Sequence, residues 1–240
     1  MRKNETSYFD LMTEQEEENS QKTQKELRQE IKLYQDSLNL LIEILDNLYP
    51  TIEKSANSLM DPILLMIMSK IIMSLKSFFN LVIKGYYHEA MVISRNTLES
   101  VLLCILVTEK EEYALKWLKG KVTPCEVRKA LELKGDVNLK DLYRRMSQYV
   151  HVNLRSFDSI VELEIEREKG KMSVNWVPRF KKDWAYSFFI HGISYIFLLI
   201  LHLSTLYKDI LKEILIDKIS RHRKRVEEKF KEFQSEFLRE

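Results

Sequence analysis

The sequence predicts an all-α fold built from long helices, and three observations support this. Hydrophobic residues make up 45% of the 240 residues, which is enough for a sizeable core. Only 5 glycines and 4 prolines are present, so few turns can form and the elements between them must be long. Apolar residues recur mainly with the spacing of a helix face. A β fold of this length would need many more turns.

Composition also narrows the functional classes. The net charge of +2, from 38 basic and 36 acidic side chains, does not by itself predict nucleic-acid binding. The two cysteines form no visible paired framework and the first residues contain no apolar signal segment, so we expect a cytoplasmic location. Without a glycine-rich phosphate loop, a CxxC pair or an HExxH sequence, we expect neither a cofactor nor a metal.

The first fifty residues are expected to form a helical arm. Thr13 and Glu16 have the spacing of a capping box, which would start a helix. Nothing breaks that helix until Pro50. Its first half is polar on all sides, whereas an apolar stripe begins at about Ile31. Residues 1–50 are therefore assigned to an arm that starts in solvent and docks later.

Residues 51–213 are expected to form the core of a helical bundle. Asp61 followed by Pro62 is a favourable helix start, and Gly85 is a favourable end. Thr123 followed by Pro124 repeats the start signal. The expected helices of this region span about 62–84, 87–108, 111–119, 124–134 and 138–152.

One segment of this core changes to the period of a β-strand. Apolar and polar residues alternate on both sides of Lys169 and Gly170, which offer a turn. This pattern predicts a β-hairpin at about 160–177, inserted among the helices. The alternating apolar residues are Val161, Leu163 and Ile165, then Met172, Val174 and Trp176.

The C-terminal region is expected to be helical throughout. Residues 182–239 contain no proline and only Gly192, so they form either one very long helix or two with a bend near Asp217. The tail, 214–240, is amphipathic and has too little core of its own. It should pack against the N-terminal arm or a second subunit. Its stripe consists of Val226, Phe230, Phe233 and Phe237.

Charged residues are concentrated near the two ends of the chain. These runs are either solvated helix faces or surfaces that contact each other, within one chain or between two chains. The acidic run comprises Glu14, Glu16, Glu17 and Glu18, and the basic run comprises Lys218, Arg221, Arg223, Lys224 and Arg225.

Two apolar segments are long enough to raise the question of a membrane. Lys70 and Lys76 lie inside the first, 63–83, where charges would be costly in a bilayer. The second, 185–207, has no formal charge but carries a polar stripe at helical spacing. We therefore expect buried bundle helices and no membrane partner, with a membrane-associated protein as the alternative. The stripe consists of Ser187, His191, Ser194, His202, Thr205 and Asp209.

The first candidate site begins at Tyr143 on an expected helix. Arg144 and His151 are seven residues apart and share a face, with Ser147 between them, whereas Arg145 points about a third of a turn away. The arginine can hold a phosphate and the histidine can transfer a proton near neutral pH, which would suit cleavage of RNA without a metal. Alternatively, the histidine caps the helix end and the arginines pair with acidic residues.

The second candidate site is a charged pair on an apolar helix. Arg95 and Glu99 are four residues apart, and His88 lies seven residues before Arg95 on the same face. A charged pair in such a helix is expected to be partly buried and to need compensation. The pair is either a structural link between helices or the second wall of the site around His151.

These two segments carry a resemblance to known proteins. A family of uncharacterised bacterial helical proteins has a "G..EA...R..LE" helix followed by a "Y..LS..VH" helix. The first helix resembles Gly85 to Ala90 together with Arg95 and Glu99, and the second resembles Tyr143 to His151. The pattern is also similar to the HEPN superfamily, whose hallmark is an arginine followed four to six residues later by a histidine. The resemblance implies a HEPN-like bundle that cleaves RNA without a metal in toxin–antitoxin and phage-defence systems, with its site at a dimer interface.

Under that interpretation Arg144, Ser147 and His151 would be catalytic, and Tyr143, Arg145 and the second site would bind substrate or support it. RNA, a second copy of the chain and an antitoxin or other partner protein are the expected partners. Many HEPN-like bundles are inactive, so a non-catalytic binding module is the alternative function.

Overall fold

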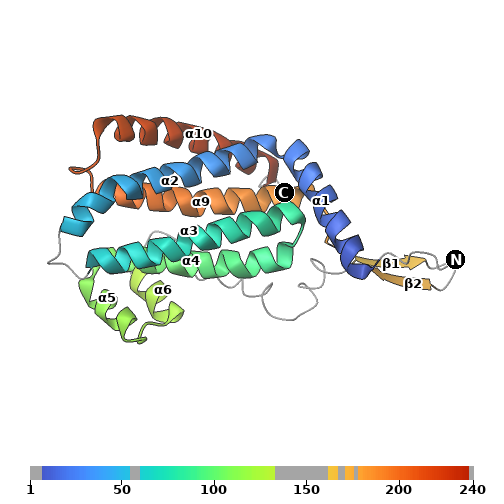
Figure 1. Ribbon diagram of the computed structural model, residues 1–240, viewed down its shortest axis with the longest axis horizontal. Helices are drawn as coiled ribbons and strands as arrows, with labels where there is room; N and C mark the ends of the chain where they lie inside the picture. Colours follow the sequence, from blue (N-terminus) through green and yellow to red (C-terminus); the bar gives the residue numbers. More distant parts are fainter. Residues whose placement is uncertain (1–6, 55–59, 133–161, 167–170, 176–177, 238–240) are drawn as a thin grey trace.

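The computed structural model describes residues 7–54, 60–132, 162–166, 171–175 and 178–237. These residues form a bundle of α-helices, which confirms the predicted all-α class (Figure 1). The helices are α1 (Tyr8–Glu26), α2 (Arg28–Lys54), α3 (Met60–Lys84), α4 (Tyr87–Glu109), α5 (Glu111–Leu118), α6 (Pro124–Glu132), α9 (Lys182–Leu206) and α10 (Glu213–Phe237).

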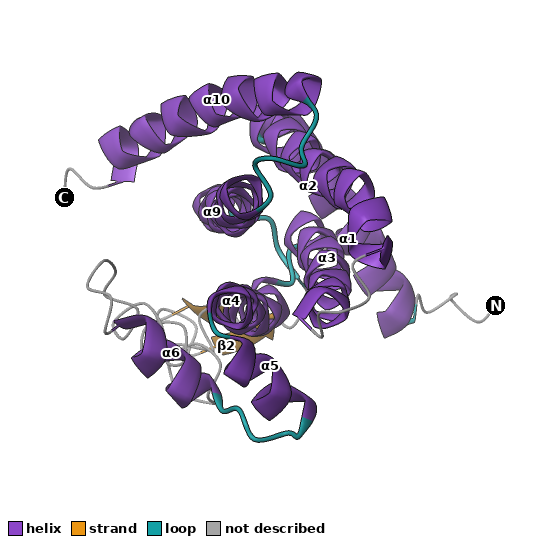
Figure 2. Ribbon diagram, turned by 90° about the vertical axis from the view of Figure 1, so that its left-hand side faces the viewer, coloured by secondary structure: helices purple, strands orange, loops and turns teal. Residues whose placement is uncertain are grey.

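Helix α9 is the centre of the bundle. It packs against α2, α4, α10 and α3, and an end-on view shows these helices on three of its sides (Figure 2). Phe189, Ile193, Ile196 and Leu199 of this helix are completely buried. Because α2 and α10 both pack on α9, residues from the expected arm, core and tail regions contribute to one hydrophobic core.

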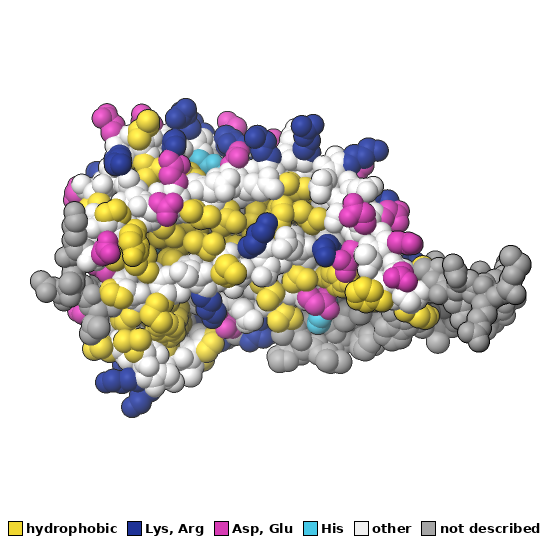
Figure 3. Space-filling model, viewed as in Figure 1, with side chains coloured by type: hydrophobic (Ala, Val, Ile, Leu, Met, Phe, Trp, Pro, Cys, Tyr) yellow, Lys and Arg dark blue, Asp and Glu magenta, His cyan; other side chains and the backbone are white. Residues whose placement is uncertain are grey.

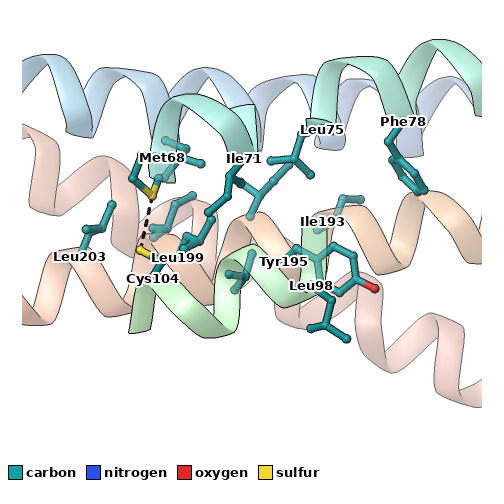
Figure 4. Close-up of a cluster of buried hydrophobic side chains, with 14 of the residues drawn as sticks. Met68, Ile71, Leu75, Phe78, Leu98, Cys104, Ile193, Tyr195, Leu199 and Leu203 are labelled. Atoms are coloured by element: carbon teal, nitrogen blue, oxygen red, sulfur yellow. Dashed lines mark hydrogen bonds between the residues drawn. The ribbon is translucent and has the colours of Figure 1, made fainter. Parts of the chain in front are cut away.

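The interior between α3, α4 and α9 is filled by hydrophobic side chains, both aliphatic and aromatic (Figure 4). Cys104 of α4 lies there, and its Sγ is 3.6 Å from Sδ of Met68 on α3. Burial raises the pKa of the Cys104 thiol to about 12, so this cysteine is an unreactive core residue.

The outer face of α3 carries a polar stripe with exposed apolar residues beside it. Figure 3 shows apolar side chains along the surface between α2 and α3. Met66 and Met73 are 56% and 68% exposed on this face. The polar stripe consists of the exposed residues Ser69, Lys70, Ser77, Asn80 and Lys84, with Ser74 partly buried.

The predicted start and end of the first helix are wrong. The capping box is made by Ser7 and Asp10: the Asp10 backbone N–H donates to Ser7 Oγ at 3.1 Å, and the Ser7 N–H donates to the Asp10 carboxylate at 3.2 Å. Thr13 instead lies inside α1 and donates to the Phe9 carbonyl. The helix also breaks at Leu27, where φ is −122°, and α2 continues past Pro50 to Lys54.

Helix α1 is also not a free arm, because polar side chains dock it. Asn19 is 1% exposed, and its Nδ2 donates to the carbonyls of Lys84 at 3.0 Å and Pro178 at 2.8 Å. Its Oδ1 accepts from the Phe180 N–H at 2.9 Å. Glu16 accepts from Lys84 at 2.6 Å, and this hydrogen bond lowers the pKa of Glu16. The docking of α1 could not be predicted from the hydrophobic pattern, because it depends on polar groups and not on an apolar stripe.

Gly85, between α3 and α4, is the residue that lets α1 approach this closely. Its φ is +87°, a conformation in which a side chain is strained. A Cβ at this position would lie 2.9 Å from the Arg179 carbonyl oxygen and 2.9 Å from Asn19 Nδ2. The glycine therefore ends α3 and leaves room for three chain segments to meet.

Two short strands precede α9. The strands β1 (Glu162–Glu166) and β2 (Lys171–Asn175) pair antiparallel. Leu163 is opposite Val174, and Ile165 is opposite Met172. This places apolar residues of the two strands across from each other.

The C-terminal region forms two helices, and the break comes earlier than the expected bend near Asp217. Helix α9 ends at Leu206, and α10 begins at Glu213. The Tyr207 backbone adopts φ −113° and ψ 28°, which lies outside the helix. The Tyr207 hydroxyl donates to Asp61 at 3.0 Å, so the turn is fixed to the start of α3.

Candidate functional site

The structure places three of the predicted site residues, His88, Arg95 and Glu99, on α4. The other predicted site residues lie outside the described residues, so their grouping stays a prediction. They are Tyr143, Arg144, Arg145, Ser147 and His151.

Hydrogen bonds fix the rotation of α4 against the central helix α9. Ser94 Oγ is 3.1 Å from the Tyr195 hydroxyl, and Thr108 Oγ1 is 2.6 Å from His202 Nε2. Burial raises the pKa of Tyr195 to about 12, so this contact involves a neutral hydroxyl. Arg95 is the residue after Ser94, about 100° further round the helix, and it therefore points to the side of this contact.

Arg95 and Glu99 form the partly buried ion pair that the sequence predicts. Arg95 Nε is 3.3 Å from Glu99 Oε1, and the side chains are 21% and 22% exposed. Ions at this depth lose part of their hydration, so each stabilises the other against that cost.

His88 lies on the same face of α4, two turns before Arg95 and about 10 Å away along the axis. The residue is partly buried. Its Nδ1 is buried and has no hydrogen-bond partner among the described residues. A buried ring nitrogen without a partner is unfavourable, so this atom would gain from contact with a polar ligand.

The three side chains can therefore present a guanidinium, a carboxylate and an imidazole along one face. This set suits a phosphate ester flanked by polar groups. Within the part of the chain that the structure describes, no group of three His, Cys, Asp or Glu residues could hold a metal ion.

A second polar cluster, between α2 and α10, was not predicted as a site. Its centre is His222, which is 5% exposed and whose Nε2 is 2.9 Å from Ser37 Oγ. The Ser37 hydroxyl donates to the Leu33 carbonyl at 2.7 Å, so its oxygen accepts a hydrogen bond from the Nε2–H of His222. The burial of His222 could have been inferred from its place in the sequence, because it lies between Ile219 and Val226 on the apolar stripe of α10, and both of these residues are buried.

Ion pairs flank this histidine on both sides. Lys218 Nζ lies 2.5 Å from Glu43, Arg225 lies 2.8 Å from Asp36, and Lys229 Nζ lies 2.6 Å from Glu30. The basic run therefore contacts acidic residues of α2. Of the acidic run near the N-terminus, Glu16 instead contacts Lys84 of α3. Among the described residues, these pairs do not join the two charged runs within one chain, which was one of the alternatives that the sequence left open.

We expect the stability of the protein to fall as the pH drops below about 6.5. Burial, and then the neighbouring Arg225, lower the pKa of His222 from 6.5, although Asp36 opposes this; burial also lowers the pKa of His191. The unfolded chain therefore binds protons before the folded one, and stability decreases between the unfolded and folded pKa values. The slope is at most about 1.4 kcal/mol per pH unit for each histidine.

Urea unfolding of the full chain at pH 7.5 and 5.5 measures this dependence. His222→Gln keeps a donor for Ser37 and should reduce the loss at pH 5.5. Replacing Arg221, which is exposed, with glutamine is the matched control. An equal pH dependence in the His222→Gln and unmodified proteins would contradict the assignment.

By length and composition alone, three of the described helices could cross a membrane. They are Asp61–Lys84, Tyr87–Glu109 and Lys182–Leu206. The two predicted segments, 63–83 and 185–207, fall in the first and third. Helix Tyr87–Glu109 was not predicted as a membrane segment, because Arg95 and Glu99 interrupt its apolar residues.

Comparisons with known proteins found no match: no family model, no curated protein and no solved structure is similar to this chain.

Proposed function

We propose that this protein is a HEPN-like, metal-independent ribonuclease of a toxin or phage-defence system. In this proposal it is a cytoplasmic homodimer that cleaves RNA and is restrained by a partner protein such as an antitoxin. The observation that carries the proposal is the partly buried Arg95–Glu99 pair, with His88 on the same face of α4. Such a pair is weak evidence for stability alone, so binding a charged substrate gives a reason for its presence.

The proposed reaction uses the RNA itself as nucleophile. The ribose 2′-hydroxyl attacks the adjacent phosphorus atom, the bond to the 5′ oxygen breaks, and a 2′,3′-cyclic phosphate and a 5′-hydroxyl result. His151 would transfer the proton between these two oxygens. Arg144 would hold the phosphate, since an arginine fork matches its geometry, and Ser147 would help to position it.

The residues of α4 would form the opposite wall of this site. Arg95 supplies a second cation for the charge that develops on the phosphate. Glu99 orients Arg95 through their 3.3 Å contact. His88, Tyr143 and Arg145 would support substrate binding.

The test is cleavage of a fluorescent RNA by purified protein in excess EDTA. We expect cleavage by the unmodified chain and a loss of roughly 100-fold or more in His151→Ala, the size typical of a general acid–base group. Expression should be toxic, and the same substitution should relieve the toxicity. Arg221→Ala, in an exposed position on α10, is the control and should cleave normally.

Two results would overturn the proposal: cleavage that is equal in the unmodified and His151→Ala proteins, or no cleavage together with equal growth on expression of both. The second result would favour a non-catalytic binding module.

A further inference from the structure

The outer face shared by α2 and α3 carries a band of exposed apolar side chains (Figure 3). Met66 and Met73, two turns apart on α3, are 56% and 68% exposed, and Tyr49 of α2 is 51% exposed. A contiguous apolar patch on the surface of a soluble protein often marks an interaction site. The partly buried apolar residues of this band are Leu38 and Ile42 of α2 and Leu65 and Ile72 of α3.

Contacts of Tyr34 show how the two helices face each other. The Tyr34 hydroxyl of α2 donates to the Leu75 carbonyl of α3 at 2.9 Å, and the Tyr34 ring centre is 5.3 Å from that of Phe79. Leu38 lies one turn after Tyr34, and Ile72 lies two turns before Phe79, so both continue the same contact line. The band therefore follows the seam between α2 and α3.

Charges of opposite sign lie at the two ends of the band. Lys76 of α3 is exposed, and its Nζ lies 5.4 Å from the centre of the Phe79 ring. Asp46 of α2 is exposed, one turn after Ile42. Neither forms an ion pair with another residue that the structure describes. The charged residues of α2 and α3 that do so are Glu30, Asp36 and Glu43, with α10, and Lys84, with α1.

The positions of these groups along the bundle have a common midpoint. Lys76 follows Leu75 and so lies near the level of Tyr34, whereas Asp46 is twelve residues past Tyr34, about 18 Å further along α2. Because α3 runs antiparallel to α2 (Figure 1), Met73 and Met66 lie about 3 Å and 14 Å from that level in the same direction. The midpoint of Lys76 and Asp46 and that of Met73 and Met66 are therefore both about 8 Å from Tyr34.

We propose that this face binds the same face of a second copy of the chain, across a twofold axis at that midpoint. A twofold interface uses one patch on both subunits, so groups equidistant from the axis meet. Met73 of each copy would lie against the partner's Met66, and Lys76 would come within reach of the partner's Asp46. A bilayer would bury both charges without an opposite charge, so a second copy suits this face better.

The size of the face agrees with this partner. Helix α3 has 25 residues, a length of about 38 Å, and two adjacent helices are about 20 Å wide. The shared face therefore measures up to about 750 Å², close to the roughly 800 Å² that each partner buries in a stable interface. The inference gives the proposed homodimer a surface, and it rests on the proposed function only for the expectation that two copies associate.

Sedimentation of the full chain over a range of concentrations tests the surface. We expect a dimer, and we expect Met73→Asp to raise its Kd at least tenfold, because the new carboxylate would be buried against apolar groups of the partner. Leu118→Asp is the matched control, since Leu118 is 50% exposed on α5, on the opposite side of α4 from α2 (Figure 2). This variant should dimerise normally.

Exchange of the two charges tests the predicted contact. Lys76→Asp and Asp46→Lys should each raise Kd several-fold at low salt, because each places like charges together. The double variant should restore the dimer. Within one chain the two positions are about 18 Å apart along the bundle, so restoration would have to come from a contact between copies.

A chain that stays monomeric, a dimer that Met73→Asp leaves unchanged, or a double variant no tighter than the single ones overturns the inference. Binding of a monomeric chain to phosphatidylcholine vesicles, lost in Met73→Asp, would assign the face to a membrane instead. A dimer that depends on Met73 in a protein that does not cleave RNA refutes the ribonuclease and leaves the surface. Cleavage by a monomer that depends on His151 does the reverse.

Discussion

Replacing Asn19 by leucine is expected to lower the free energy of unfolding by about 3–5 kcal/mol, the sum of several buried polar groups left without partners. Asn19 makes three hydrogen bonds to backbone groups, of Lys84, Pro178 and Phe180. Leucine has a similar size but can replace none of them. The two carbonyls and the N–H would then remain desolvated, or α1 would leave its place and expose them to water.

Urea unfolding monitored by circular dichroism measures this change. Gln21→Leu is the control, because Gln21 is exposed and, within the described part of the chain, bonds only to Glu17 on its own helix. We expect a change within about 0.5 kcal/mol there. Hydrogen exchange gives a second readout, since the Phe180 amide should lose protection in Asn19→Leu. Equal stability of the two variants would show that Asn19 does not hold α1.

Gly192→Val is the second substitution with a large expected effect, a loss of about 3 kcal/mol or more. Gly192 lies in the middle of α9, where a Cβ would overlap Tyr34 Cε2 of α2 and lie 3.0 Å from Phe78 Cε1 of α3. Tyr34 cannot easily move away, because its hydroxyl donates to the Leu75 carbonyl at 2.9 Å and its ring packs against Phe189. The added methyl groups would force the helices apart.

A double-mutant cycle with Tyr34→Leu separates this overlap from other effects. The leucine should recover at least about 1 kcal/mol of the loss in the Gly192→Val background, because contacting residues couple by about 0.5–3 kcal/mol. Ser194→Val, a partly exposed position on the same helix, is the control for the valine itself. If the two substitutions are additive, close packing between Gly192 and Tyr34 is not the cause.

The sequence predicted well the features that depend on neighbouring residues. The partial burial of Arg95 and Glu99 followed from their spacing within an apolar helix. The end of α3 at Gly85 followed from the glycine, which adopts the positive φ expected there. In both cases the deciding contacts lie within a few residues of each other.

Features that depend on distant residues were not predictable in the same way. Asn19 bonds to groups 65 and 159 residues away, and these groups are backbone atoms that every residue type carries. The Ser37–His222 contact joins residues 185 apart, so only the apolar stripe on either side of His222 indicated its burial.

The position of the first capping box was predicted wrongly for a local reason. Ser7 and Asp10 have the same spacing as Thr13 and Glu16, and the sequence alone does not decide between the two pairs.

The way in which Asn19 is held also has a consequence during synthesis. Helix α1 leaves the ribosome early, but the Pro178 carbonyl that it binds is 159 residues later in the chain. At about 5–20 residues per second, that interval lasts roughly 8–32 s. Throughout this time α1 can contact α3 through Lys84, but Asn19 lacks its partners at Pro178 and Phe180. The docking of the N-terminal helix is therefore expected to be completed late, when residues 178–180 become available.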